Sequence, residues 1–208
     1  MTTSESNSLP FEVNDGFKSA FEPGFYDQIL THDLFEKQVM PFEIKTSIHN
    51  CFACDNKKFI KPLELGNFDA SVMVIGEVPS DVDFKTPEGQ LLVKTLTWAN
   101  YSLEDVYFTS LCKCETTATP ERCYTHLLSE ILCVRPAIII SLGYDVGKFF
   151  DSNINMAGYT TNLLDKFEMI TTYRTIFTMS DRNLYEEYCN HIMFAKHKVD
   201  NKLQGVHD

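Results

Sequence analysis

A short apolar run that ends in a glycine turn constrains the fold more than any other part of the sequence. The run is Val72–Ile75, and Gly76 ends it. A run of this length, rich in β-branched residues, is typical of a strand buried on both faces of an α/β sheet. The turn Gly76–Ser80 therefore follows the carboxyl end of a strand, which is where ligands bind in open α/β sheets.

Further strands and helices alternate along the chain. The expected strands are Ser71–Gly76, Asp105–Leu111, Ala137–Leu142 and Tyr173–Thr178. The expected helices are Phe25–Val39, Pro87–Asn100, Glu121–Cys133, Tyr144–Phe150 and Arg182–Lys196. Because strands that alternate with helices form parallel sheets covered on both faces, we expect an α/β protein with three layers, α/β/α, around a central four-stranded, mostly parallel sheet.

The length and composition indicate one main domain with short ends. We expect a flexible acidic N-terminal extension at residues 1–23, the main domain at 24–198 and a polar tail at 199–208. The longest apolar runs are too short to span a bilayer, and the polar start of the chain is not typical of a secretory signal. We therefore expect a cytoplasmic protein with no membrane association. The expected compartments include the host cytoplasm of an infected cell.

The charge bears on the partners that the chain can bind. The formal net charge is −11, which argues against tight non-specific DNA binding, because that needs Lys and Arg to neutralise phosphates. A local basic patch remains at Lys57, Lys58 and Lys61. The phenylalanines at positions 11, 17 and 21 either pack on their own domain or dock into a protein partner, and the acidity of this extension suits a partner with a positive surface.

The cysteines are candidate metal ligands. Seven cysteines in a cytosolic chain stay reduced. Cys51 and Cys54 are spaced so that two thiolates can bind one centre, which is half of a tetrahedral or cubane site. The other half comes from Cys112, Cys114 and Cys123, and chemistry alone does not choose between the first two. We read Cys133 and Cys189 as small buried hydrophobic residues.

The order of these features resembles the family-4 type of uracil-DNA glycosylase, the iron–sulfur branch of that superfamily. The features that carry the resemblance lie between Cys51 and about Thr178: Cys51 with Cys54, the turn Gly76–Ser80, Lys113–Cys114, Thr119–Pro120 followed by Cys123, and Arg135–Gly143. The resemblance implies a [4Fe–4S] cluster on Cys51, Cys54, Cys114 and Cys123, with a structural role near DNA; zinc is the alternative.

The resemblance also implies roles for other residues. The candidate catalytic residues are Glu77, Asp81 and Asp83, of which the two aspartates would activate water. The candidate base pocket consists of Gly76, Pro79, Ser80, Phe84, Ser110 and Arg182. The candidate contacts to the DNA backbone are Lys57, Lys58, Lys61 and Lys113.

Three departures from the family pattern affect the chemistry. Ser80 replaces the glycine that closes the turn, and Ser110 replaces the asparagine that reads the uracil edge. Where the family has His-Pro-Ser after the fourth strand, we find Phe177–Arg182, with Arg182 as the local positive charge. His191 is the nearest histidine downstream and falls inside an expected helix.

We therefore expect a non-catalytic or weakly active uracil-DNA glycosylase-like module, stapled by a cluster, that binds DNA or a replication or transcription partner. One alternative is an active DNA glycosylase that hydrolyses the N-glycosidic bond of uracil or a modified base in a rearranged pocket. Another is a zinc-stapled structural protein. The degenerate motifs and acidic extension suggest a phage or viral lineage.

Overall fold

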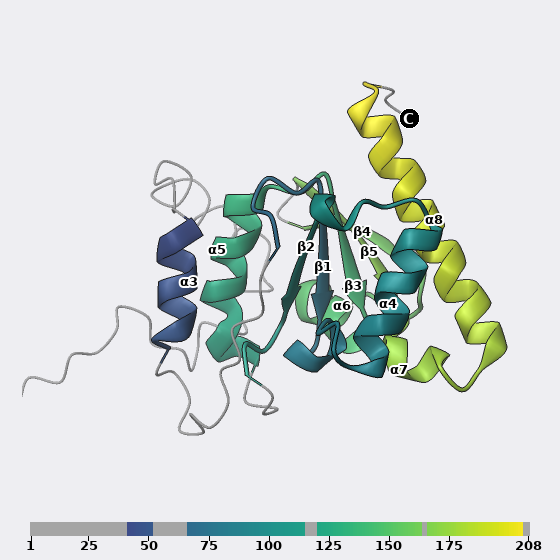
Figure 1. The fold of residues 1–208 in the computed structure, drawn as a ribbon, viewed down its shortest axis with the longest axis horizontal. Helices are drawn as coiled ribbons and strands as arrows, with labels where there is room; N and C mark the ends of the chain where they lie inside the picture. The colour runs from purple at the N-terminus through teal and green to yellow at the C-terminus, as the bar shows by residue number, and fades with distance from the viewer. Residues whose placement is uncertain (1–40, 52–65, 115–119, 164–165, 206–208) are drawn as a thin grey trace, which may run out of the picture. The chain divides into compact units, whose positions relative to one another are not determined.

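The computed structural model describes residues 41–51, 66–114, 120–163 and 166–205, which all belong to one compact unit at positions 38–208 (Figure 1). The expected extension at 1–23 and the expected helix Phe25–Val39 lie outside the described residues, as do Cys54, Lys57, Lys58 and Lys61.

A mixed sheet forms the middle layer. Its described strands are β1 (Val72–Gly76), β2 (Val106–Ser110), β3 (Ile138–Leu142), β4 (Thr160–Leu163) and β5 (Phe167–Thr172), in the order β2-β1-β3-β5-β4. All pairs are parallel except β4 with β5. Val74 lies opposite Phe108 and Ile140, and every residue of β1, β2 and β3 is buried. This burial explains why the three strands are mostly apolar.

Helices cover both faces of the sheet. The helices α4 (Pro87–Trp98) and α8 (Arg182–Leu203) pack on the face that carries Val74, Phe108 and Ile140. The helices α5 (Tyr124–Val134) and α6 (Tyr144–Phe150) cover the opposite face, and α3 (Pro41–His49) packs on the outside of α5 (Figure 1). The expected three-layer α/β/α architecture is confirmed. Among the described helices, none is long and apolar enough to cross a membrane.

The end of the chain differs from our expectation. The fourth parallel strand is β5, Phe167–Thr172, and not Tyr173–Thr178. The stretch from Thr175 to Thr178 is instead the short helix α7. The reason is burial: Met169 and Ile170 are fully enclosed, whereas Ile176 and Phe177 are exposed. The edge strand β4 makes the sheet five-stranded within the described residues, one strand more than expected.

The last helix is also longer than expected. α8 continues to Leu203, past the expected helix end at Lys196 and past the expected start of the polar tail at residue 199. Glu168 of β5 explains the extra turns, since its carboxylate lies 2.9 Å from the Lys198 ammonium and 2.8 Å from that of Lys202.

Candidate functional site

The turn after β1 is held in place by one buried carboxylate. Asp81 ends the short 3-10 helix η2 (Pro79–Asp81), and its Oδ2 accepts the backbone N–H groups of Glu77 at 2.9 Å and Val78 at 3.1 Å. A Cβ at Gly76 would lie 2.7 Å from the Asp81 Cβ, so a glycine is needed there. The turn therefore presents the Glu77 side chain at the carboxyl edge of the sheet.

Arg174 crosses from the end of β5 to this turn. Its Nε donates to Asp81 Oδ1 at 2.9 Å, and its Nη1 forms an ion pair with Glu77. Burial by itself lowers the pKa of the guanidinium, but the carboxylates of Asp81, Glu77 and Asp145 outweigh it and raise the pKa above its usual value. The two candidate catalytic carboxylates, Glu77 and Asp81, thus hold a permanent cation between them. We call Glu77, Asp81 and Arg174 the carboxylate–arginine cluster.

Sequence reasoning missed Arg174. The expected strand Tyr173–Thr178 placed it inside the sheet, whereas β5 ends at Thr172, so Arg174 follows the strand directly. We expected the position of the His-Pro-Ser motif at Phe177–Arg182, whereas in the structure Arg174 lies two residues after the last parallel strand. Arg182, the cation that we expected, is wrong for this role, because it lies in the first turn of α8 with a side chain that is 90% exposed. The run Phe167–Thr172, of which all residues but Glu168 are buried, is the stretch that the sequence analysis should have assigned to the strand.

The other candidate pocket residues lie close to the turn but use their polar atoms locally. Ser110 is fully buried, and its hydroxyl donates to the Cys112 carbonyl oxygen at 2.7 Å. Thr86 Oγ1, at the N-cap of α4, lies 2.7 Å from the carbonyl oxygens of both Ser80 and Asp83. Phe84 is 47% exposed and meets the ring of Phe108 edge to face at 4.9 Å. Phe84 is thus the exposed aromatic ring next to the turn.

Two further side chains of the Gly76–Glu88 region have defined positions. Pro79 is buried as the first residue of η2, where its fixed φ suits the start of a helical turn. Asp83 is half-buried, and its Oδ1 accepts the backbone N–H of Lys85 at 2.9 Å. The structure therefore brings the candidate residues from Gly76 to Phe84 into one compact loop.

Lys113 does not reach the surface, contrary to our expectation of a contact with the DNA backbone. It is 5% exposed, and its Nζ donates to Thr109 Oγ1 at 2.6 Å and to the Ser110 carbonyl oxygen at 2.7 Å. The ammonium also forms an ion pair with the fully buried Glu130 of α5. An ammonium with these partners is not presented to a phosphate.

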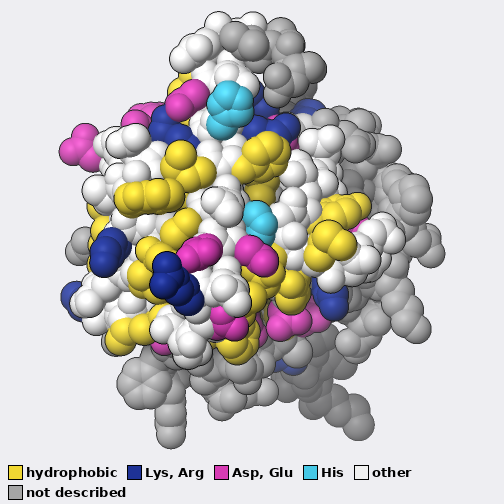
Figure 2. All heavy atoms as spheres, turned by 90° about the vertical axis from the view of Figure 1, so that its right-hand side faces the viewer, with side chains coloured by type: hydrophobic (Ala, Val, Ile, Leu, Met, Phe, Trp, Pro, Cys, Tyr) yellow, Lys and Arg dark blue, Asp and Glu magenta, His cyan; other side chains and the backbone are white. Residues whose placement is uncertain are grey.

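His191 packs beside the sheet and not at the turn. It lies on α8, and its Nδ1 is 3.1 Å from Thr172 Oγ1 at the end of β5. Burial lowers the pKa of His191, and the charge of Glu187 offsets this only in part. The face that carries α8 shows acidic, basic and hydrophobic side chains interspersed, with no continuous basic surface among the coloured residues (Figure 2).

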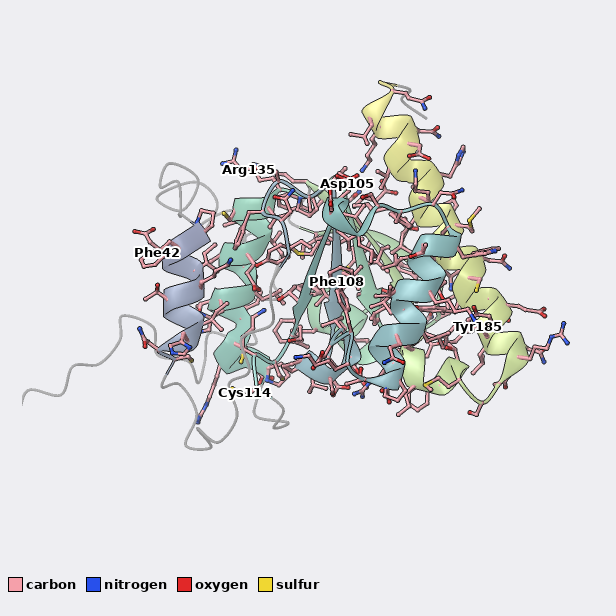
Figure 3. All side chains as sticks on the ribbon, in the orientation of Figure 1. Phe42, Asp105, Phe108, Cys114, Arg135 and Tyr185 are labelled. Carbon is pink, nitrogen blue, oxygen red and sulfur yellow. The ribbon has the colours of Figure 1, made fainter. Side chains whose placement is uncertain are left out.

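Two of the described cysteines of the implied ligand set, Cys114 and Cys123, lie at the same end of the domain. Cys114 follows β2, at the end of this strand opposite Asp105 (Figure 3). The backbone N–H of Lys113 donates to Cys123 Sγ at 3.4 Å, which places Cys123 against the Cys112–Cys114 turn. Ser47 of α3 lies 3.3 Å from His126 of α5 between Oγ and Nδ1, so the end of α3 that leads to Cys51 meets the helix that Cys123 opens.

The four cysteines of the implied ligand set suit a soft metal centre in their chemistry. Thiolates are the preferred ligands of zinc and of iron–sulfur clusters. Burial, together with neighbouring Cys123 and Glu77, raises the pKa of the Cys112 thiol to about 12. Within the residues that the structure describes, no three His, Cys, Asp or Glu side chains form a group that could hold a metal ion. Cys51, Cys114 and Cys123 are among those residues, so the structure does not bring these three expected ligands into such a group, and Cys54 lies outside the described residues.

Comparisons with known proteins agree on one family. The profile described as "Uracil DNA glycosylase superfamily" matches residues 63–194. The type-4 uracil-DNA glycosylase of Thermotoga maritima is 33% identical over 98 residues, which are 41% of this chain and 51% of the relative. That of Archaeoglobus fulgidus is 30% identical over 122 residues, 51% of this chain and 61% of the relative. That of Saccharolobus solfataricus is 32% identical over 130 residues, 54% and 60% of the two chains. The matches span between half and about three fifths of these relatives.

Proposed function

The chain belongs to the uracil-DNA glycosylase superfamily, and from that premise we propose that it is a DNA-binding module of this fold whose base-excision activity is weak or absent. The observation that supports this proposal is the carboxylate–arginine cluster. Glu77 and Asp81 are the acidic groups of the expected catalytic turn, and both are ion-paired with Arg174.

The carboxylate–arginine cluster bears on the cleavage of the glycosidic bond. When a glycosidic bond breaks, negative charge develops on the leaving base and must be held by donors that are already in place. The histidine of the family pattern is missing from Phe177–Arg182, and the cation at the turn is Arg174, whose Nε and Nη1 donate to the protein's own carboxylates. Loss of one preorganised donor typically lowers the rate by about 10²–10³.

Base recognition is weakened at the same place. A flipped base is read by hydrogen bonds to its edge and by stacking. Ser110 replaces an amide that offers a donor and an acceptor together, and its hydroxyl donates to the Cys112 carbonyl oxygen. Phe84 remains available for stacking because its side chain is partly exposed.

We propose the remaining roles from the family resemblance and from the residue types in the sequence. Cys51, Cys54, Cys114 and Cys123 would hold a [4Fe–4S] cluster, with zinc as the alternative. The bound group would supply cross-links between distant parts of the chain and no chemistry at the base. Lys57, Lys58 and Lys61 would contact DNA phosphates, and residues 1–23 would bind a protein partner in replication or transcription.

One observation favours a second candidate, an active glycosylase with a rearranged pocket. The Arg174 side chain is 27% exposed, and its guanidinium stays charged at every physiological pH. A base that docked against it would meet a cation, which could hold the charge of the leaving group.

An excision assay separates the two candidates. Duplex and single-stranded oligonucleotides that carry uracil, hypoxanthine or 5-hydroxymethyluracil are incubated with a molar excess of the whole chain, and abasic sites are counted. We expect counts at or near the protein-free control, together with a gel shift that weakens as salt rises. Rapid, complete excision of any of these bases would overturn the proposal and support the second candidate.

A further inference from the structure

The short helix α7 buries its threonines and exposes its large apolar residues. Thr175 and Thr178 are 1% and 3% exposed. Ile176, Phe177 and Met179, the residue that follows α7, are 45%, 61% and 48% exposed. We propose that these three apolar side chains, which we call the α7 patch, bind a protein partner through an amphipathic helix with one apolar and one basic face. The inference goes beyond the proposed function, because it depends neither on base excision nor on DNA.

The buried side of α7 holds the patch in this orientation. Thr178 Oγ1 donates to the Thr175 carbonyl oxygen at 2.7 Å, and Thr175 Oγ1 lies 3.5 Å from the hydroxyl of the fully buried Tyr188 of α8. The helix packs against both α4 and α8. Because a buried hydroxyl without a partner costs free energy, these contacts favour the orientation with the threonines inside. The apolar side chains of the patch are thus held outward.

The exposed apolar surface at α7 is continuous and not a scatter of single residues. Single exposed apolar residues are normal, whereas contiguous ones with polar residues around them mark interaction surfaces. The three side chains of the α7 patch lie within four consecutive positions. The exposed Phe84 ring lies on the loop that leads into α4, the helix that packs against α7. The patch is therefore a candidate docking surface.

The charges around the patch favour a basic partner over DNA and over a second copy of the chain. The segment that contains the patch, residues 173–187, and the loop that leads into α4, residues 76–88, together hold seven acidic residues and three basic ones. One of the three is Arg174, which is already paired with Glu77 and Asp81. An excess of carboxylates repels the phosphates of DNA, and it repels a second copy of a chain whose net charge is −11. Electrostatic complementarity therefore favours lysine and arginine on the partner. The lysines proposed above as DNA contacts belong to neither segment.

A binding assay with synthetic peptides tests the inference on the whole chain. Three helical peptides of equal length carry leucines on one face and lysine, glutamine or glutamate on the other. Fluorescence anisotropy of the labelled peptides gives the Kd for the unmodified chain, for the double variant Ile176→Ser with Phe177→Ser, and for the matched control Leu203→Ser. Leu203 is 68% exposed and lies at the opposite end of α8 from α7 (Figure 1). Thermal unfolding shows whether each variant is folded.

We expect the lysine peptide to bind the unmodified chain at least about tenfold more tightly than the glutamine peptide, and the glutamate peptide to bind most weakly. The double variant should bind the lysine peptide at least about tenfold more weakly, because it loses two apolar anchors, whereas Leu203→Ser should keep the unmodified Kd. Absence of binding by the lysine peptide, or equal binding by the double variant and the unmodified chain, would overturn the inference.

The same double variant separates two other occupants of the patch. Gel shifts with single-stranded and duplex oligonucleotides measure DNA binding, and sedimentation measures self-association. We expect both to be the same in the double variant and in the unmodified chain. A lower affinity for DNA would assign the patch to DNA, and the loss of a dimer would assign it to a second copy, so either result would overturn the inference. Neither result would refute the proposed weak or absent base excision, which the excision assay tests separately.

Discussion

Replacement of Asp81 by alanine tests whether this carboxylate holds the turn or serves the chemistry. In the structure Asp81 accepts two backbone N–H groups and the Arg174 Nε, and it is 3% exposed. The substitution removes the acceptor of the buried Val78 N–H and of the half-buried Glu77 N–H. It also removes one partner of Arg174.

The expected cost follows from these contacts. A buried donor without an acceptor costs about 1–3 kcal/mol, with the lower end for a group near the surface. The sum for Asp81→Ala is about 3 kcal/mol in the free energy of unfolding, which corresponds to a fall of about 6–12 °C in the unfolding temperature for a chain of this size. Urea titrations followed by circular dichroism measure it.

Asp83→Ala is the matched control in the same loop. Asp83 is half-buried and accepts one backbone N–H, from Lys85 at 2.9 Å, so we expect a loss of about 0.5–1 kcal/mol. The reasoning fails if the two alanine variants have unfolding free energies within about 1 kcal/mol of each other.

Three further predictions follow from the same region. Gly76→Ala should lower the free energy of unfolding by about 2 kcal/mol in urea titrations, because the new Cβ would lie 2.7 Å from the Asp81 Cβ; a neutral substitution would contradict the close approach. Burial lowers the pKa of His191 in the folded chain below its usual 6.5. As pH falls, the unfolded chain therefore binds the proton first, and the free energy of unfolding should decrease below about pH 6.5. His191→Gln should flatten this pH dependence between about pH 7.5 and 5.5, and a steeper slope would refute the prediction. Arg174→His should raise single-turnover uracil excision about tenfold or more, whereas Arg174→Lys should not; equal rates in both variants would argue against the cluster as the block.

The central strands and two of the helices could be predicted from the sequence to within about two residues. The reason is that Val72–Gly76 and Ile138–Leu142 are buried on both faces, which makes nearly all of their residues apolar. The start of α4 at Pro87 could be predicted equally well, because Thr86 caps the helix. Its Oγ1 accepts the Gly89 N–H at 3.0 Å. These signals are local, and so the sequence carries them without help from tertiary structure.

The carboxylate–arginine cluster could not be predicted in the same way. Arg174 and Asp81 are 93 residues apart, and nothing near either residue indicates the other. The aromatic and β-branched residues of Tyr173–Thr178 also mimic a strand, although Ile176 and Phe177 are exposed in α7. The residue types of Tyr173–Thr178 indicate a strand, and only the exposure of Ile176 and Phe177 in the folded chain excludes it.

Lys113 shows a second limit. A lysine next to a cysteine at the end of a strand is consistent with a surface contact, and lysines are seldom buried without a partner. Its partner Glu130 lies on the next helix, 17 residues further on, on a face that the apolar neighbours Leu127 and Ile131 mark as buried. A glutamate on the buried face of an expected helix was the available signal that a buried cation faces it.

The most direct test of the account is the rate of uracil release by the unmodified chain under single-turnover conditions, with protein in excess over a uracil-containing oligonucleotide. We predict release indistinguishable from the protein-free control, or at least about 10²-fold slower than that of the Thermotoga maritima relative measured beside it. Release as fast as that of the relative would show that Arg174, paired with Glu77 and Asp81, does not prevent excision, and would contradict the account.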